Sequence, residues 1–255
     1  MAKTIKYRFS RDAWRYIRVI VPVVVLWQVA AMLTANRIIL PAPTDVYSAF
    51  VKMLTDGTLI EATWISVKRL MSGYIIGALI AVPLGVAVGL SSVLRASLTP
   101  IVEILRPIAG IAWIPLALVL FGIGDSLVLF IIVYGAIFPI LINSISAVLE
   151  TNNNLILAAR TFGLTRFSIV RQVILPASMP TIFTGLEIGL GTAWMSLVAA
   201  ELIGGSSGLG YLLTFARQLL ETAEMIGAIV VIGVLGFSST LILRGIRRFA
   251  IPWAV

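Results

Sequence analysis

Long apolar stretches alternate with short polar connections along most of this chain. Six of them are long enough to cross a bilayer, because a transmembrane helix needs about 20 mostly apolar residues. They lie at residues 17–35, 72–92, 100–120, 126–149, 179–200 and 223–245. Stretches of this length are typical of spanning helices and much longer than strands. The pattern therefore predicts an all-α, polytopic membrane protein with about six transmembrane helices.

The third stretch is the least regular of the six. Pro107, Gly110 and Pro115 interrupt its helical pattern, and broken backbone at membrane depth is tolerated only where protein buries it or where it lines a cavity. Residues 36–71 are the least hydrophobic part outside the termini, and 44–56 have the pattern of a short amphipathic helix. We interpret this part as an interfacial linker at the outer surface of the membrane.

The most informative polar stretch is the connection at residues 150–178, between the fourth and fifth apolar segments. Asn152 is a suitable helix N-cap, the residues that follow it are amphipathic, and Gly163 is placed to end that helix. A second basic amphipathic stretch, 164–173, is expected to end at Leu175-Pro176. The sequence thus predicts two short helices joined by a glycine turn, which present a rigid, positively charged surface to a cytoplasmic partner.

The positions of Lys and Arg predict the orientation in the membrane. Most of them fall near the two termini and in the 150–178 connection, so we expect all three in the cytoplasm. The first apolar stretch lacks a small-residue cleavage site and is followed by further spans, which favours a retained helix over a signal peptide. The net charge is +8, but the basic residues flank apolar spans instead of forming one dense stripe. This distribution argues against nucleic-acid binding.

Composition narrows the chemistry further. Hydrophobic residues make up 60% of the chain and charged residues 12%, against about 25% charged residues in soluble domains. Cysteine and histidine are both absent, which excludes disulfides and thiolate catalysis and removes the commonest general base and metal ligand. No Gly-x-x-x-x-Gly-Lys-Ser/Thr motif occurs, so a P-loop for nucleotide phosphates is missing. We expect a protein that is not itself an enzyme and holds no metal or cofactor of its own.

Three Gly-x-x-x-Gly pairs predict close helix packing. They are Gly73/Gly77, Gly85/Gly89 and Gly185/Gly189. We favour packing within the chain over a seam between two copies, although small residues serve both roles. The glycine-rich run 204–210 looks superficially like a phosphate loop but follows a span. We interpret it as an outer loop, either a surface that meets an external protein or a plain turn.

The 150–178 connection resembles the signature loop of ATP-binding-cassette (ABC) importer permeases, whose pattern is Glu-Ala-Ala, three residues, Gly, nine residues, Ile-x-Leu-Pro. Here Ala158-Ala159 is followed after three residues by Gly163 and, nine residues later, by Val173-Ile174-Leu175-Pro176. Leu157 replaces the glutamate, so the ion pair of that acid is not expected. By this resemblance, the surface that couples to an ATPase consists of Leu155, Leu157, Ala158, Ala159, Arg160, Phe162, Gly163, Leu164, Arg166, Leu175 and Pro176.

The resemblance extends from about residue 63 to residue 248. The matching runs are Ser72-Gly73 to Gly89, Arg106-Pro107, Ala112 to Leu116, Phe121 to Gly124, Ala199 to Ile203 and Gly208 to Gly210. They look most similar to the nitrate, sulfonate and taurine branch of these permeases. The resemblance implies a type I ABC importer permease fold.

The same resemblance implies the organisation and partners of the chain. Residues 1–62 would hold an N-terminal cytoplasmic segment, the first transmembrane helix and the outer linker, 63–248 the core permease domain, and 249–255 a cytoplasmic tail. The chain would work in the bacterial inner membrane as a homodimer, with two cytoplasmic ABC ATPase subunits and an external substrate-binding protein. ATP and Mg would be bound by the ATPase subunits. The cargo would be a small solute, a sulfonate or taurine-like compound or another small organic or inorganic anion.

The apolar segments contain a few residues that are candidates for the transport pathway or its gate. They are Arg106, Trp113, Pro115, Glu187, Trp194, Met195 and Glu201. An acid inside a membrane is costly and faces a pathway or a partner. Glu187, which stands where related permeases commonly carry a basic residue, either lines the pathway or pairs with Arg106 or another basic group. Glu201 is expected to cap or orient the loop that follows it.

Two other classes of protein fit the sequence less well. An ion-coupled secondary transporter predicts inverted repeats and paired intramembrane carboxylates, and neither pattern is clear here. A membrane-embedded enzyme needs a cluster of reactive side chains, which a chain without histidine or cysteine and without acids at metal-ligand spacing does not provide.

Overall fold

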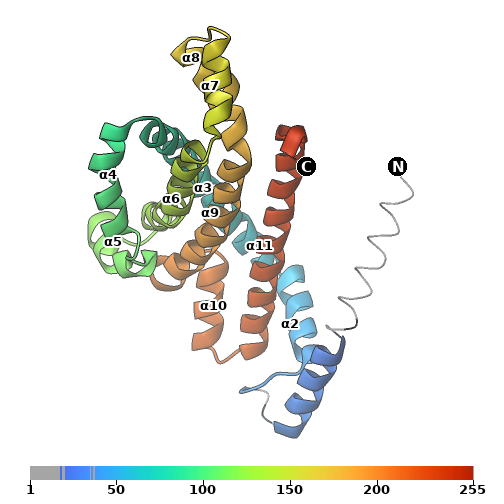
Figure 1. Ribbon diagram of the computed structural model, residues 1–255. Coiled ribbons are helices and arrows are strands. Elements are labelled where there is room, and N and C mark those ends of the chain that lie inside the picture. The colour runs from blue at the N-terminus through green and yellow to red at the C-terminus, as the bar shows by residue number, and fades with distance from the viewer. Residues whose placement is uncertain (1–17, 19–20, 35, 37, 255) are drawn as a thin grey trace. The chain divides into compact units, whose positions relative to one another are not determined.

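The computed structural model of the chain describes residues 18, 21–34, 36 and 38–254. The chain divides into two compact units, one of residues 1–60 with 212–231 and the other of residues 61–211 with 232–255. In the described part, every regular element is a helix (Figure 1). The all-α prediction is therefore confirmed.

The helices follow one another in this order. They are Val21–Thr34, α2 (Pro43–Thr55), α3 (Thr58–Leu90), α4 (Ser92–Leu105), the 3-10 turn η1 (Gly110–Trp113), α5 (Ile114–Phe121), α6 (Asp125–Leu149), α7 (Asn153–Thr161), α8 (Arg166–Ile169), the π-helical turn η2 (Val170–Ile174), α9 (Leu175–Gly204), α10 (Leu209–Gln218), α11 (Thr222–Ala250) and η3 (Pro252–Ala254).

In the first unit, α2 is the short amphipathic helix that the sequence predicts at 44–56. Pro43 occupies its first turn, where a missing backbone N–H costs nothing. The Asp45 carboxylate accepts a hydrogen bond from the Ala42 N–H at 3.2 Å. At the other end, Lys52 Nζ donates to Glu224 Oε1 at 3.0 Å, so an ion pair joins α2 to the start of α11 within this unit.

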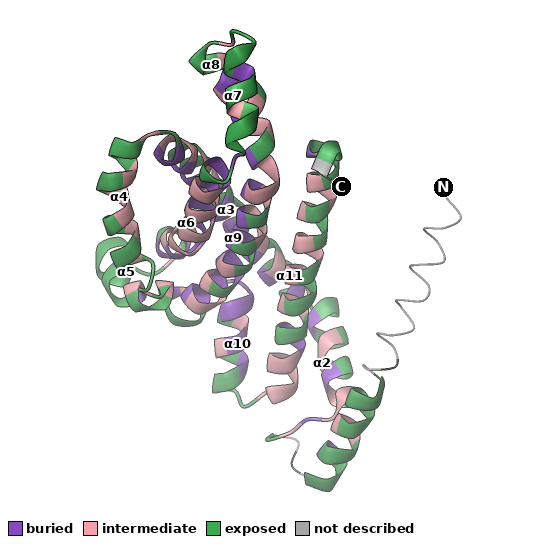
Figure 2. Cartoon of the chain, in the orientation of Figure 1, coloured by how far each residue is buried: buried purple, intermediate pink, exposed green. Residues whose placement is uncertain are grey.

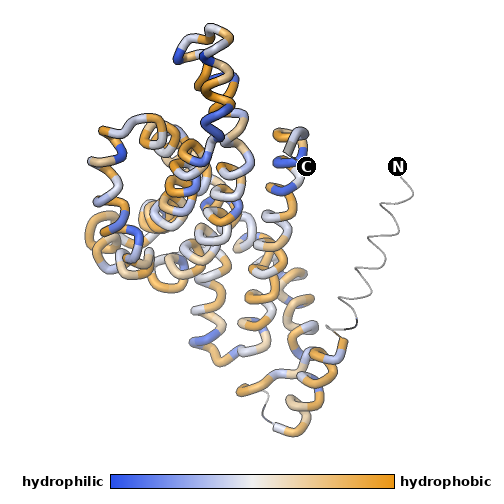
Figure 3. The backbone as a smooth tube through the Cα atoms, viewed as in Figure 1, coloured by the Kyte–Doolittle hydropathy of each residue, from blue (hydrophilic) through white to orange (hydrophobic). Residues whose placement is uncertain are grey.

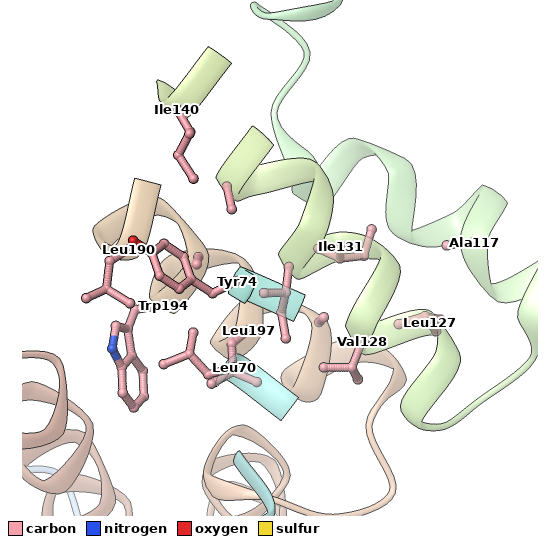
Figure 4. Packing of buried hydrophobic residues seen from close by; sticks show 14 of the residues in the cluster. Leu70, Tyr74, Ala117, Leu127, Val128, Ile131, Ile140, Leu190, Trp194 and Leu197 are labelled. Atoms are coloured by element: carbon pink, nitrogen blue, oxygen red, sulfur yellow. The ribbon is translucent and has the colours of Figure 1, made fainter. Parts of the chain in front are cut away.

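The second unit is built around α3, α6 and α9, whose apolar faces form its core (Figure 4). Leu127, Val128, Ile131 and Ile140 of α6 lie there with Leu197 of α9, and all five are almost inaccessible to solvent. The remaining buried members of this core include Leu70, Tyr74, Ala81, Ile114, Ala117, Ile132, Ala136, Leu141, Leu190, Ala193, Trp194 and Ala200. Helices far apart in the sequence therefore share one core.

Close packing against α6 explains the glycine pairs. A Cβ added at Gly73, Gly77, Gly85 or Gly89 would lie 2.5–3.2 Å from Ile132, Ala136, Ser144 or Val148 of α6, respectively. On α9, a Cβ at Gly185 or Gly189 would lie 2.5–2.6 Å from Asn143 or Ile140. Because these glycines have no side chain, the backbones of α3 and α9 can approach α6 closely within the chain. Small residues serve this purpose where no hydrophobic effect drives helix packing.

Four described helices are long and apolar enough to span a membrane, and five if α4 and α5 count as one bent span. The four are Thr58–Leu90, Asp125–Leu149, Arg166–Gly204 and Thr222–Ala250. The predicted span at 17–35 lies partly outside the described residues, and its described portion Val21–Thr34 is a shorter apolar helix. The prediction of about six spans thus corresponds to four or five long ones in the part that the structure describes.

The predicted span at 100–120 is not one straight helix. α4 ends at Leu105 and the η1–α5 segment begins at Gly110, with an 83° bend between them. Pro107 lies in the break, where its ring and its missing N–H prevent a continuous helix. The irregular backbone that the sequence predicts in this span is therefore a sharp corner.

Two other predicted boundaries are wrong. Residues 58–71 do not form an interfacial linker, because α3 starts at Thr58 and runs without a break to Leu90. Pro176 does not end the second helix of the 150–178 connection either, because helical backbone continues from Arg166 to Gly204. The widened π turn η2 precedes Pro176, which falls in the first turn of α9, where proline is tolerated.

Many large hydrophobic side chains remain exposed (Figures 2 and 3). Leu79 is 70% exposed, Val119 81% and Phe249 91%. Water would not be a suitable neighbour for so much apolar surface, whereas lipid chains would cover it. The exposure pattern therefore agrees with a membrane-spanning protein.

Candidate functional site

The predicted coupling surface is a helical segment at one end of the α6–α9 pair (Figure 1). The Asn152 side chain caps α7 by accepting a hydrogen bond from the Asn154 N–H at 2.9 Å. Gly163 follows α7 with φ +78°, a left-handed conformation that glycine adopts without strain. Thr165 then caps α8 by accepting from the Ser168 N–H. The starts of α7 and α8 and the turn between them are thus each set by a local sequence signal.

A small separate core holds this segment in place. Ala159, Ile169 and Ile174 are buried with Val148 from the end of α6, and Leu164 packs against them. Of the predicted coupling residues, Ala159 and Leu164 therefore serve mainly to hold the segment together. Leu175 and Pro176 are half-buried at the start of α9.

The outer surface of the segment is apolar and basic. Leu155 is 50% exposed, Leu157 57%, Phe162 83% and Phe167 74%. Ala158, Arg160, Gly163 and Arg166 are exposed as well. Exposed leucine and phenylalanine side chains on a rigid, capped segment are typical of a docking surface for another protein.

A second candidate site is a cavity of about 440 Å³ formed by the α4–η1 corner, α6 and α9. Its polar side chains are Arg106, Tyr134, Asn143, Thr192 and Ser196. Apolar residues complete the wall, namely Ile108, Ala109, Phe138, Pro139, Ile142, Ile188 and Met195, with Gly110 and Gly135. Of the predicted pathway residues, Arg106 and Met195 lie here.

Three further residues predicted for the pathway, namely Trp194, Trp113 and Pro115, lie outside the cavity lining. Trp194 is buried in the core, and its Nε1 donates a hydrogen bond to Ser239 Oγ at 2.9 Å. Trp113 is half-buried, with its ring centroid 5.6 Å from that of Tyr134. Its Nε1 is buried and has no hydrogen-bond partner among the described residues. Pro115 lies exposed in the first turn of α5.

Glu187 lies on α9 and pairs with two arginines of α11. Its carboxylate accepts from Arg244 Nε at 3.1 Å and from Arg247 Nη1 at 3.3 Å. Only 16% of the Glu187 side chain is exposed. Of the two interpretations open from the sequence, the geometry fits the structural pair, made with Arg244 and Arg247, while Arg106 lies in the cavity wall.

Glu201 is the centre of a polar cluster, which we call the Glu201 cluster (Ser66, Arg69, Asp125, Glu201 and Ser207, with the backbone N–H groups of 209 and 210). Ser66, Arg69 and Glu201 are buried, whereas Asp125 is exposed. Its carboxylate accepts from Arg69 Nη1 at 3.0 Å, from Ser66 Oγ at 2.8 Å and from the Gly210 N–H at 2.9 Å. Arg69 also donates to Asp125 Oδ1 at 2.7 Å and to the Ser207 carbonyl at 2.6 Å. Arg69 and Glu201 are 6% and 1% exposed.

The glycine-rich loop after α9 folds directly over this carboxylate. The Leu209 N–H donates to Ser66 Oγ at 2.8 Å. Gly208 has φ +103°, and a Cβ at Gly210 would lie 2.6 Å from Glu201 Cβ. The glycines are needed because the loop backbone lies against the buried acid and leaves no room for side chains. The structure thus shows Glu201 orienting the loop that follows it.

Sequence reasoning does not find several residues of the Glu201 cluster and of the cavity. Arg69 was assigned to the outer interface, and Ser66, Asp125 and Ser207 carried no motif. The cavity residues Tyr134, Asn143, Thr192 and Ser196 were also passed over. For Asp125 and the cavity residues the available signal was polarity, since each lies within a predicted apolar segment or directly beside one. Ser66, Arg69 and Ser207 lie outside those segments and give no such signal.

Comparison with known proteins gives the family. Residues 73–254 match the family described as binding-protein-dependent transport system inner membrane component. A Methanocaldococcus jannaschii protein named as an ABC transporter permease is 40% identical over 229 residues, 88% of this chain and 85% of that protein. The taurine transport system permease protein of Escherichia coli is 36% identical over 90% of this chain and 85% of its own length. The bicarbonate transport system permease protein of Synechococcus elongatus is 33% identical over 83% and 80%.

Solved structures agree with the fold. The inward-facing MetNI methionine ABC transporter matches with a TM-score of 0.67 and 24% identity, over 76% of this chain and 96% of that chain. This similarity shows the helix arrangement alone. Together with the family match and the close relatives, it places this chain among the inner membrane permease components of binding-protein-dependent ABC importers.

Proposed function

We propose that two copies of this chain form the translocation pathway of an ATP-driven importer for a small anion. Two cytoplasmic ABC ATPase subunits would bind ATP and Mg and dock on the segment 152–174, and an external binding protein would deliver the solute. Both termini would lie in the cytoplasm. The membership of the family supports the permease role.

The capped segment between α6 and α9 is the observation that carries this proposal. Its exposed side chains Leu155, Leu157 and Phe162 have no core to join within the described chain. Its own small core makes it rigid, and its basic residues suit the cytoplasmic side. A rigid apolar surface at this place fits a motor protein that binds and pushes it.

The backbone gives a direct route from that surface to the cavity. From Arg166 to Gly204 the helix is continuous over 39 residues, and Ile188, Thr192, Met195 and Ser196 of the same helix line the cavity. When the ATPase subunits close on ATP, a displacement of the segment would move α9 as a body. The cavity wall would shift with it, so ATP would change the relative populations of two helix packings.

The names of the relatives support an anionic cargo. Relatives are named for the transport of taurine, aliphatic sulfonates and bicarbonate. Taurine and the sulfonates carry a sulfonate group and bicarbonate is an oxyanion, so a single negatively charged, oxygen-rich head group is their shared chemistry. We propose a substrate of this class, with sulfonates first.

The test is to break the docking surface without disturbing the fold. Leu157→Asp and Phe162→Asp place charges on exposed positions, so we expect normal membrane insertion and thermal stability. Copurification with the co-expressed ATPase subunit, and ATP-dependent uptake of labelled taurine into proteoliposomes, should both be lost. Gln218→Glu, which adds the same charge at the exposed end of α10 and outside the candidate spans, is the matched control. Retention of ATPase binding and uptake by both variants would refute the assignment.

A further inference from the structure

The cavity beside the α4–η1 corner contains one charged side chain. Arg106 is exposed, it lines the cavity, and its guanidinium has no hydrogen bond or ion pair within the described part of the chain. Arg69, by contrast, uses Nε, Nη1 and Nη2 on protein acceptors. A guanidinium has five N–H donors arranged in a rigid fork, and no acceptor in the described part of the chain takes up those of Arg106.

Tyr134 holds the backbone on either side of Arg106. Tyr134 Oη lies 2.8 Å from the Leu105 carbonyl oxygen and 3.1 Å from that of Ile108. These two carbonyls flank Arg106 and Pro107 in the break between the helices. The hydroxyl has one proton to donate to these two acceptors, and its position between them holds the backbone of the corner. Tyr134 acts as a positioning residue for Arg106.

The rest of the wall supplies neutral polar groups opposite an apolar surface. Ser196 Oγ has no hydrogen bond to the described residues, and Gly135 leaves the space in which this side chain sits. Asn143 donates to the Pro139 carbonyl through Nδ2, which leaves its Oδ1 and one further N–H for the cavity. Phe138 and Met195 form an apolar part of the same wall.

The local charge of the cavity is positive. None of its lining residues is acidic. Glu187 precedes the lining residue Ile188, but Arg244 and Arg247 compensate its charge. The acid is therefore already paired and does not cancel the charge of Arg106.

We propose that this cavity is a binding subsite within the permease for the oxyanion head group of a small organic anion, with Arg106 as the recognition residue and Phe138 and Met195 beside the short carbon chain. The subsite rests on the proposed transport of small anions and assigns part of the specificity to the permease itself. The planar fork of arginine matches the oxygens of sulfonate and carboxylate groups.

The absence of cysteine in the chain allows a direct test. Ser196→Cys introduces a thiol into the cavity as the only one in the permease. It is treated, in the complex assembled in nanodiscs with cysteine-free ATPase subunits, with two methanethiosulfonates of similar size, one carrying a sulfonatoethyl group and the other a trimethylammonioethyl group. In each reaction the thiolate attacks the thiosulfonate sulfur, a mixed disulfide forms and methanesulfinate leaves. The ratio of the anionic to the cationic rate reports the charge of the cavity.

We expect Arg106→Gln to lower this rate ratio by about tenfold or more, because a single charge lining the same cavity acts in opposite directions on the two reagents. Arg106→Lys keeps the charge and should keep the ratio within about threefold. Thr184→Cys is the control, exposed on the same helix about 18 Å away at 1.5 Å per residue. An unchanged ratio in Arg106→Gln, or an equal change at position 184, would overturn the proposal.

Occupancy is tested by protection. Ethanesulfonate should slow modification of the thiol at position 196, and ethyl methyl sulfone, its neutral analogue, should not. In Arg106→Gln, the ethanesulfonate concentration that gives half-maximal protection should rise about tenfold or more. In Arg106→Lys this concentration should lie between that of the protein with Arg106 and that of Arg106→Gln, because lysine keeps the charge but lacks the planar fork of N–H donors. Equal protection by both compounds would overturn the subsite. These readouts need no ATP and no transport, so an importer that fails to import and a subsite that fails to bind are distinguishable.

Discussion

The two arginines Arg69 and Arg106 show how differently one side chain is used in the same unit. Arg69 is buried and every one of its nitrogens donates to the protein, whereas Arg106 lies in an open cavity with no protein acceptor in the described chain. A buried, fully bonded charge stabilises one arrangement of helices. A charge that no acceptor of the protein takes up is available to a ligand. The hydrogen-bond partners of an arginine, and not the residue type, therefore distinguish the structural role of Arg69 from the ligand-binding role proposed for Arg106.

The largest expected effect comes from neutralising each arginine in turn. Arg69→Gln leaves Glu201 buried without its cation, so we expect a loss of about 3–5 kcal/mol in the free energy of unfolding. Arg106→Gln should change it by less than about 0.5 kcal/mol. Both are measured by SDS-induced unfolding of the purified permease in mixed micelles. Similar losses in the two variants would remove the distinction between the arginines.

The next effect tests how tightly the loop covers the Glu201 cluster. In Gly210→Ala, the new Cβ would lie 2.6 Å from Glu201 Cβ and 2.9 Å from the Val198 carbonyl oxygen. We expect this overpacking to cost about 2–3 kcal/mol. Gly191→Ala is the control on α9, beside the cavity residue Thr192, because its Cβ would meet nothing within 4 Å. Its stability should stay the same or rise by up to about 1 kcal/mol, because alanine is favoured over glycine inside a helix. A loss similar to that of Gly210→Ala would show that contact with the Glu201 cluster is not the cause.

Two serines give a smaller and more selective contrast. Ser66 donates to Glu201 and accepts from the Leu209 N–H. Ser66→Ala leaves the buried Leu209 N–H without an acceptor and removes one of the donors to Glu201, so it should cost about 1–2 kcal/mol. Ser196 has no hydrogen bond to the described residues, so Ser196→Ala should leave the stability within about 0.5 kcal/mol. The same unfolding assay compares them. A larger loss for Ser196→Ala would mean that the cavity wall is a structural network.

The helical architecture and the two short helices of the 150–178 connection could be predicted from the sequence because both depend on local patterns. Apolar length defines the spans, and the Asn152 cap and Gly163 turn are local signals that the structure follows. The start of α3 was misplaced because Arg69 interrupts the apolar run. A hydropathy window counts a charge but does not see that Glu201, 132 residues further along the chain, compensates it.

The sites depended on long-range contacts, and their prediction was correspondingly incomplete. Glu187 is 57 and 60 residues from its partners Arg244 and Arg247, so sequence spacing left both of its interpretations open. The cavity brings together a helix break, α6 and α9, and only packing shows which of their polar residues share it. Arg106 is a candidate from the sequence because it belongs to the Arg106-Pro107 run that resembles related permeases, whereas no motif singles out Tyr134 or Ser196.

The smallest expected effect separates having a partner from being buried. Lys52 pairs with Glu224 at 3.0 Å, but 62% of its side chain is exposed. The hydrogen bond to Glu224, followed by the charge of that carboxylate, raises the pKa of Lys52 above its ordinary value. A raised lysine pKa adds stability below the unfolded-state pKa, and this contribution is lost as the pH rises through the folded-state pKa.

In Glu224→Gln, the pKa of Lys52 should therefore fall toward its ordinary value, with little change in stability at neutral pH, because exposed ion pairs contribute little. NMR of ¹³C-methylated lysines measures the pKa, and Lys52→Arg assigns the signal. Asp56→Asn is the matched control, since Asp56 acts on Lys52 through charge alone and most weakly, so its pKa shift should be smaller. An equal shift in both variants would mean that the surrounding charge, and not the specific partner, sets the properties of this lysine. The distinction between Arg69 and Arg106 would then have to rest on burial alone.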